Sequence, residues 1–323
     1  MNTPASTLGY HLVAFVTVAI WGSTFVFTKM LLLHGFTPAQ IFTLRFLMAY
    51  VLLLTYELLW KRRAFRLTCT SWQDELIMVL LGVTGGSLYF LCENAAMLFT
   101  TATNTSLIVC SCPLFAMLLA VVFFRHSERF TPTQMAGSLV AFLGMAVVVL
   151  NGRFVLHLSP LGDLLAFGAC VCWAVYSLLM KPAMSRYSTL FITRKVFFYG
   201  LLTIVPYYLL FPAEAHVFLP SRYLDMTYLG SVFTIHLDLI LYLLFLGFVA
   251  SMLCFLVWNW VLGKLGAVIA TNWVYFNPIV TILFAWWLLN EQITPWFVVG
   301  TLLILVGMYL CDRQPADHAE AVA

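Results

Sequence analysis

The sequence is an internal duplication, and its two halves carry the same landmark residues in the same order. Three pairs share a constant offset of 165 residues: Gly82 with Gly247, Asn94 with Asn259, and Pro113 with Pro278. Further along, the offset is 163, and it pairs Thr131, Pro132, Gly137, Gly144 and Met145 with Thr294, Pro295, Gly300, Gly307 and Met308. Upstream, Trp21 and Lys29 match Trp173 and Lys181. A chain of this kind must fold as two copies of one unit.

The composition indicates that this fold lies in a membrane. Of the 323 residues, 63% are hydrophobic and only 9% are charged, and the mean hydropathy is +0.98. Soluble globular domains carry about 25% charged residues, which they need to cover their surface. This chain has too few polar residues for that, so we expect lipid to be its solvent.

Apolar runs of membrane-spanning length divide the chain. A helix that crosses a hydrocarbon core about 30 Å thick needs roughly 20 mostly apolar residues. Ten runs qualify: 11–33, 38–60, 76–98, 102–124, 133–151, 160–181, 191–211, 238–262, 266–289 and 295–311. The pattern predicts an all-α polytopic membrane protein with a first five-helix repeat over 11–151, a second over 160–311, and a cytoplasmic tail at 312–323.

The basic residues predict the orientation. With the N-terminus inside, the cytoplasmic side receives Lys61, Arg62, Arg63, Arg66, Arg125, Arg129, Lys181, Arg186, Lys264 and Arg313. The outer side receives only Lys29, Arg153 and Arg222. The positive-inside rule therefore predicts that both termini are cytoplasmic in a cell membrane, either the plasma membrane or a bacterial inner membrane. Because five spans is an odd number, the second repeat must be inverted relative to the first.

The closing motifs of each half resemble the EamA branch of the drug/metabolite transporter superfamily. In the first half they run from Pro113 through Glu128-x-x-Thr-Pro to Gly137 and Gly144-Met145, and in the second from Pro278 through Asn290-Glu291 to Gly300 and Gly307-Met308. The stretch Trp21-Gly-Ser-Thr-Phe is also similar to the family's opening. The chain departs from common members at Glu93-Asn94, where apolar or small residues are usual.

The resemblance implies a fold and a function. It implies a carrier that exports amino acids or related small solutes by alternating access. It also implies that the first, third, fourth, sixth, eighth and ninth spans surround a central cavity, with the fifth and tenth at the edge.

Two charged residues inside the spans are the strongest candidates for transport chemistry. A charge near mid-membrane costs several kcal/mol unless it is paired or solvated. Glu93 in the third span could bind a substrate cation or exchange a proton, or it could be paired structurally with Arg45 or an amide. Arg45 in the second span could bind a substrate carboxylate bidentately or simply hold Glu93.

Polar and aromatic residues complete the predicted site. Asn94 and Asn259 occupy equivalent repeat positions, and either solute binding or interhelical packing would satisfy their amides. Asn272, Tyr275 and Asn277 precede Pro278 on the ninth span, where we expect them to line a cavity. Trp173 and Trp258 could line or gate it, although packing is an equally ordinary role for tryptophan. Pro113 and Pro278 are predicted to form paired hinges.

Other classes of function fit the sequence less well. We expect a secondary-active transporter that exports or exchanges a small metabolite such as an amino acid, with proton coupling as one option. The alternatives are a polytopic membrane enzyme and a channel. The histidines lie at span ends or in loops, and the sequence has no HExxH spacing, phosphate loop or filter repeat. We therefore expect no catalysis, cofactor, metal site or nucleic-acid partner, only a small-molecule substrate and lipid. The long connection is expected to form an interfacial helix around 217–229.

Overall fold

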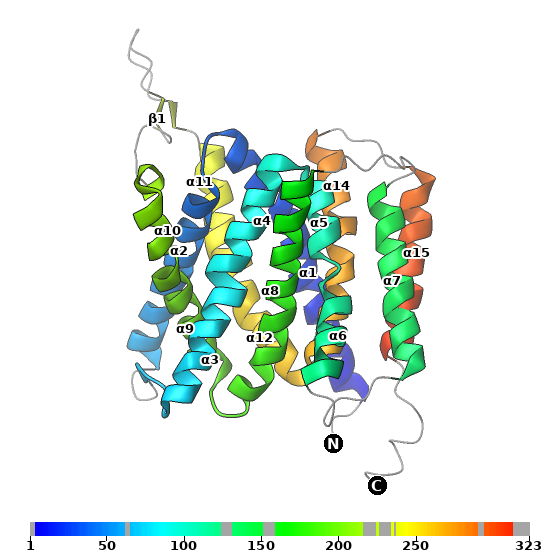
Figure 1. Cartoon of the computed structure of the whole chain (residues 1–323), viewed down its shortest axis with the longest axis horizontal. Helices are drawn as coiled ribbons and strands as arrows, with labels where there is room; N and C mark the ends of the chain where they lie inside the picture. The colour runs from blue at the N-terminus through cyan, green and yellow to red at the C-terminus, as the bar shows by residue number, and fades with distance from the viewer. Residues whose placement is uncertain are drawn as a thin grey trace.

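The fold is a bundle of membrane-spanning helices. The computed structural model describes residues 4–61, 65–123, 131–150, 159–215, 224–225, 234–235, 237–289 and 294–312. Eight helical stretches in these ranges are long and apolar enough to cross a membrane, and two shorter apolar helices, at 132–148 and 295–311, accompany them. Together they match the ten predicted runs. Figure 1 shows them standing side by side.

The first repeat supplies five spans, some of them in pieces. Their elements are α1 (Pro4–Leu33); α2 (Pro38–Trp60); α3 (Trp72–Gly82), η2 (Val83–Ser87) and α4 (Leu88–Phe99); α5 (Ala102–Val109) and α6 (Cys112–Phe123); and α7 (Pro132–Leu150). The second repeat has the same series. Its elements are α8 (Pro160–Met184); α9 (Thr189–Thr203) and α10 (Val205–Leu210); α11 (Leu237–Leu244), η5 (Phe245–Leu253) and α12 (Cys254–Leu265); α13 (Ala267–Asn272), η6 (Trp273–Phe276) and α14 (Asn277–Leu289); and α15 (Pro295–Asp312).

The two repeats run in opposite directions through the bundle. In Figure 1, α1 begins at the lower edge, whereas α8, which opens the second repeat, begins at the upper edge. The α15 helix ends at the lower edge, on the same face as the start of α1. The chain therefore has the predicted fold class, an all-α membrane protein made of two inverted five-helix repeats.

The second span of each repeat begins with a side-chain cap. Thr37 Oγ1 accepts a hydrogen bond from Gln40 N at 3.3 Å, and Thr37 N donates to Gln40 Oε1 at 3.1 Å. Pro38 follows at the first helical position, where a missing N–H has no cost. Ser188 caps α9 in the same way, accepting from Phe191 N at 3.4 Å. The two capping residues therefore occupy equivalent positions, and aligning Thr37 with Ser188 pairs the residues of α2 with those of α9.

The glycines of the closing motifs bring α7 and α15 into contact at the edge of the bundle (Figure 1). A Cβ added at Gly137 would lie 2.7 Å from Gly307 O, and one added at Gly144 would lie 2.8 Å from Gly300 O. Only glycine permits this approach, and close backbone packing is a main source of helix association in lipid. The repeated glycines thus form one interface, in which the first glycine of each repeat meets the second glycine of the other repeat.

Four spans are broken at equivalent places in the two repeats. The third span contains the π-helical turn η2, in which Gly86 has φ −129° and ψ −107°. The eighth span contains the π-helical segment η5, which overlaps the matching stretch at the 165-residue offset. The fourth span is interrupted between α5 and α6, and the ninth by the 3-10 turn η6. Such interruptions are frequent at functional sites in helices.

Buried ion pairs join the repeats at the face where α1 begins. Arg194 and Lys195 on α9 pair with Glu57 and Glu75 of the first repeat. Arg186 Nη1 lies 2.5 Å from Asp74 Oδ1. The sequence analysis did not anticipate these contacts. Each carboxylate comes from α2 or α3 and each cation from the α8–α9 region. The pairs of Arg194 and Lys195 compensate charge inside the apolar bundle, whereas the Arg186 side chain is 61% exposed at its surface.

One local prediction is wrong. The interfacial helix expected around 217–229 is contradicted at Leu224, because β1 (Leu224–Asp225) pairs antiparallel with β2 (Thr234–Ile235) and Leu224 lies opposite Ile235. The rest of that segment lies outside the described residues, as do Arg62, Glu128, Glu291 and the tail beyond Asp312.

Candidate functional site

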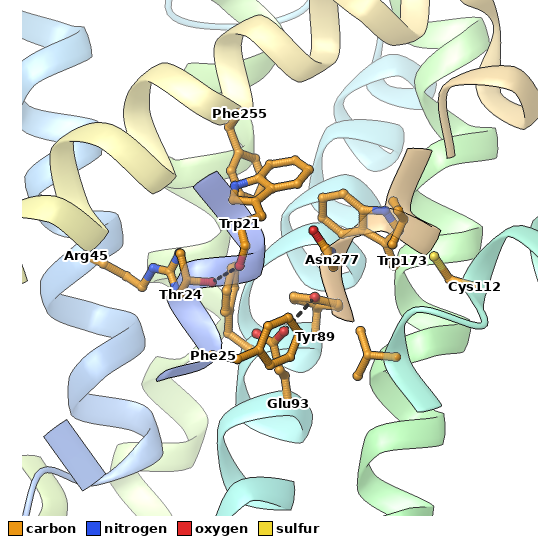
Figure 2. A pocket seen from close by; sticks show the side chains of 13 residues that line it. Trp21, Thr24, Phe25, Arg45, Tyr89, Glu93, Cys112, Trp173, Phe255 and Asn277 are labelled. Atoms are coloured by element: carbon orange, nitrogen blue, oxygen red, sulfur yellow. Dashed lines mark hydrogen bonds between the residues drawn. The ribbon is translucent and has the colours of Figure 1, made fainter. Parts of the chain in front are cut away.

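A small cavity lies between the two repeats, at the centre of the bundle (Figure 2). Its lining comes from the six spans that the resemblance implies, with Arg45 of α2 in addition. The lining residues are Trp21, Thr24, Phe25, Arg45, Tyr89, Phe90, Glu93, Val109, Cys112, Trp173, Phe255, Val274 and Asn277. These side chains leave a cavity volume of about 30 Å³ for water. Side chains must therefore separate before the cavity can hold a metabolite.

The cavity lies where the repeats face each other, because much of its lining is duplicated. Four pairs of equivalent residues contribute: Trp21 with Trp173, Phe90 with Phe255, Val109 with Val274, and Cys112 with Asn277. Trp21 and Trp173 meet edge to face, with ring centroids 5.3 Å apart and planes at 88°. Phe255 contacts both, at 5.7 and 5.9 Å. Duplication therefore supplies a largely aromatic, pseudo-symmetric frame.

The charged groups of the cavity come from the first repeat alone. The equivalent of Glu93 at the 165-residue offset is Trp258, which is fully buried. With the helix caps of α2 and α9 aligned, the equivalent of Arg45 is Val196, also fully buried. The symmetric frame thus carries an asymmetric pair of charges.

Glu93 presents its carboxylate to the cavity from α4. The side chain is 7% exposed, and Tyr89, one helical turn earlier, donates its hydroxyl proton to Glu93 Oε1 at 2.9 Å. Figure 2 shows this pair at one wall. Among the described residues, Oε2 has no hydrogen-bond partner, so half of the carboxylate remains available.

Arg45 approaches from a different wall, and it does not form a direct ion pair with Glu93. Its Nε donates to Ser251 Oγ at 2.9 Å, and its Cζ lies 4.4 Å from the centroid of the Phe90 ring. The side chain is only 2% exposed. The described residues offer its Nη groups no hydrogen-bond partner. A buried guanidinium of this kind can bind a carboxylate bidentately.

The amides predicted to bind solute lie elsewhere. Asn94 Nδ2 donates to Pro38 O at 3.2 Å. Asn259 accepts from Tyr176 Oη at 2.6 Å and donates to Thr193 Oγ1 at 2.9 Å. Each asparagine therefore ties its own span to the first turns of the second or seventh span. The two contacts lie toward opposite faces and differ in kind, because Asn94 donates to a backbone carbonyl and Asn259 donates to a side-chain hydroxyl.

The remaining predicted residues are divided between the cavity and its surroundings. Trp173 lines the cavity, whereas Trp258 packs behind Trp21 with ring centroids 5.1 Å apart. Tyr275 shares a hydrogen bond with Ser138 at 3.0 Å. Asn272 lines a separate pocket near the start of α1 and the end of α15. Pro113 and Pro278 are the second residues of α6 and α14, immediately after the breaks.

Several lining residues were not predicted individually from the sequence. Tyr89 could have been found from its position four residues before Glu93, which puts both on one helix face. Phe90 and Phe255 could have been found as a pair at the 165-residue offset. Thr24 and Phe25 could have been found in the Trp21-Gly-Ser-Thr-Phe stretch, because they follow Trp21 by three and four residues and so share its helix face. In the described ranges, no group of three or more His, Cys, Asp or Glu side chains could hold a metal ion.

Ten spans in two inverted repeats around a central cavity are the architecture of a membrane transporter. The sequence profile of the EamA-like transporter family matches residues 8–150 and again residues 160–311. The chain therefore belongs to that family, which lies within the drug/metabolite transporter superfamily.

Relatives of known name are similar over most of their length. A "Probable amino-acid metabolite efflux pump" of Escherichia coli K12 is 27% identical over 92% of this chain and 92% of its own. A "Probable terminal-alkyne amino-acid exporter" of Streptantibioticus cattleyicolor is 29% identical over 75% of this chain and 74% of its own. An "Uncharacterized transporter" of Archaeoglobus fulgidus is 26% identical over 94% of this chain and 97% of its own. A solved structure with no named function shares the fold, with a TM-score of 0.68 at 19% identity, over 94% of this chain and 97% of that one.

Proposed function

We propose that the protein is a secondary-active transporter that exports or exchanges a small zwitterionic metabolite of the amino-acid class. The observation that carries the proposal is the separation of charge in the cavity. Arg45 and Glu93 both line it and both are buried, but they do not pair directly. A solute with one carboxylate and one ammonium group would neutralise both.

Each charged group would bind a different part of the solute. The unpaired Nη groups of Arg45 match the two oxygens of an α-carboxylate. Glu93 Oε2 is available to an α-ammonium group, and the aromatic walls favour a cation over their ring faces. Each ion would thus exchange water for a partner of opposite charge. This is the condition under which buried charges are tolerated in a membrane.

Alternating access is part of the proposal. The cavity is too small for an amino acid, and the spans around it are interrupted at symmetric places. Pro113 and Pro278 are proposed as hinges at two of these interruptions. The proposed orientation places both termini in the cytoplasm, and the names of the relatives favour efflux. Glu93 would also be the site of proton exchange if transport is coupled to protons.

Counterflow in proteoliposomes tests the proposal. Vesicles loaded with unlabelled amino acid should accumulate the labelled amino acid, because a carrier exchanges solutes through one site while a channel only equilibrates them. Methyl esters, which lack the carboxylate, and the deaminated acids, which lack the ammonium, should compete poorly. Equal competition by either analogue class, or the lack of saturable counterflow with any amino acid, contradicts the proposal.

A further inference from the structure

Asn277 is the polar lining residue that the second repeat adds where the first repeat has Cys112. Its side chain is 5% exposed. Its amide oxygen Oδ1 is buried without a hydrogen-bond partner. Figure 2 shows this oxygen directed toward the space beside Trp21 and Trp173. A buried carbonyl oxygen that lacks a donor destabilises the protein, so a ligand donor there would be strongly favoured.

The position of Asn277 is fixed by contacts with α1. A Cβ added at Gly22 would lie 2.7 Å from the backbone oxygen of Asn277. Thr281 Oγ1 donates both to Gly22 O, at 2.8 Å, and to Asn277 O, at 3.0 Å. The first turn of α14 is therefore held against α1.

Trp173 offers the complementary group in the same cavity. It is 5% exposed, and its Nε1 is buried without an acceptor. Its repeat equivalent differs, because Trp21 Nε1 donates to Ala250 O at 2.8 Å. The duplicated frame therefore satisfies one indole and leaves the other free. Among the described lining residues, the cavity thus has a buried amide oxygen and a buried indole N–H without partners, in addition to the two charges.

We propose that Asn277 and Trp173 form a second polar subsite, which binds a hydroxyl or carboxamide on the side chain of the transported solute. The inference rests on the proposed function, since Arg45 and Glu93 would hold the solute's carboxylate and ammonium. A hydroxyl group donates to Asn277 Oδ1 and accepts from Trp173 Nε1. A solute of the same shape without that group would leave both protein groups unpaired. Sites with buried polar groups reject such analogues strongly.

Threonine and valine form the test pair, because both are β-branched and similar in size but only threonine has a hydroxyl. In counterflow, threonine should half-saturate the wild-type protein at a concentration at least about tenfold lower than valine does. Asn277→Leu should bring this ratio close to one by weakening threonine rather than valine. Asn277→Cys, which restores the residue of the first repeat, should act in the same direction if the leucine variant does not fold.

A matched pair of tryptophan variants separates recognition from packing. Trp173→Phe removes the free donor and should lower the threonine preference. Trp258→Phe removes an indole donor that is also buried and unpaired but lies behind Trp21, outside the cavity lining, and it should leave the ratio unchanged. A wild-type ratio near one, or a ratio that survives Asn277→Leu, overturns the subsite while amino-acid counterflow still supports the proposed function. No counterflow with any amino acid would instead overturn the proposed function itself.

Discussion

Glu93 illustrates how a single residue can be retained against the membrane's preference for apolar side chains. Its position faces a cavity, its Oε1 is held by Tyr89, and its repeat equivalent is the apolar Trp258. An apolar residue evidently fits the fold at the equivalent position. The carboxylate is thus better explained by binding than by stability.

We predict that Glu93→Gln keeps the fold and loses transport. Glutamine preserves the shape and can still accept from Tyr89, but it removes the charge and the titratable proton. The loss of a charge-assisted contact should weaken amino-acid binding by about 10-fold to 100-fold, and any pH dependence of net transport should flatten. Counterflow measures the weaker binding, and net efflux from loaded vesicles between pH 5.5 and 8.5 measures the loss of pH dependence. A poorly folded variant that Arg45→Leu rescues would make the pair structural, and normal transport across this range would remove Glu93 from the mechanism.

At this scale the sequence predicted the charges better than the amides. Glu93 and Arg45 are conspicuous because ionised groups are rare in spans, and the rule that such groups face cavities holds for both. Asn94 and Asn259 were predicted to belong to the same site because they occupy equivalent positions in the two repeats. Symmetry, however, does not distinguish a cavity wall from a helix contact. Which atoms remain unpaired, as in Asn277 and Trp173, depends on neighbours far away in the sequence.

Among the helical elements, the broken spans are the natural places for movement. Pro113 and Pro278 each lie in the first turn after a break, where proline has no N–H to donate toward Val109 O or Val274 O four residues earlier. Both valines line the cavity. The breaks therefore place a proline that lacks an N–H next to the cavity wall, and in the second repeat Val274 O accepts instead from Asn277 N.

We predict that Pro113→Ala and Pro278→Ala insert normally but change access more slowly. Alanine restores the missing donor and allows the two half-helices to join, which stiffens the span. The rate of counterflow at saturating solute should fall severalfold, while the concentration for half-saturation changes little. Pro132→Ala is the matched control, because that proline begins α7 at the edge of the bundle. If both hinge variants exchange solute at the wild-type rate, the hinge assignment is wrong.

Element boundaries followed from sequence, whereas their internal irregularities did not. Prolines and glycines at the ends of apolar runs predicted the ten spans. The π-helical segments η2 and η5 have no comparable signal, because they depend on contacts such as Gly85 with the Tyr176 ring. The ion pairs of Glu57 and Glu75 were not predicted for a similar reason, since their partners lie over a hundred residues away in the sequence.

For the whole molecule, duplication explains both the cavity and its polarity. Two inverted copies necessarily create equivalent walls where they meet, which accounts for the tryptophan, phenylalanine and valine pairs. Divergence between the copies then supplies the chemistry, since Arg45, Glu93 and Asn277 each stand opposite a different residue type. Both the repeat and the existence of a central site could be predicted from the sequence. The identity of most of its lining required the packed structure.

The last prediction concerns which face of the molecule meets the cytoplasm. Inverted repeats with an odd number of spans place Lys61 and Ser185 on one face, together with the start of α1, and Thr101 and Pro212 on the other (Figure 1). The positive-inside rule assigns the first face to the cytoplasm. Single cysteines at Thr101 and Pro212 should therefore react with a membrane-impermeant maleimide in intact cells. Those at Lys61 and Ser185 should react only after permeabilisation.

The native cysteines make this experiment practical. Six of the eight are buried, and only Cys69 and Cys92 are partly exposed. Burial and the neighbouring Glu75 carboxylate raise the pKa of the Cys69 thiol to about 12, so at neutral pH it stays protonated and reacts slowly. Replacing Cys69 and Cys92 with serine gives the background, and counterflow of that variant is the control for folding. Labelling of Lys61→Cys in intact cells would reverse the orientation, and with it the direction proposed for export. Labelling of Thr101→Cys and Ser185→Cys from the same side would contradict the inverted arrangement itself, because the two positions lie on opposite faces of the bundle.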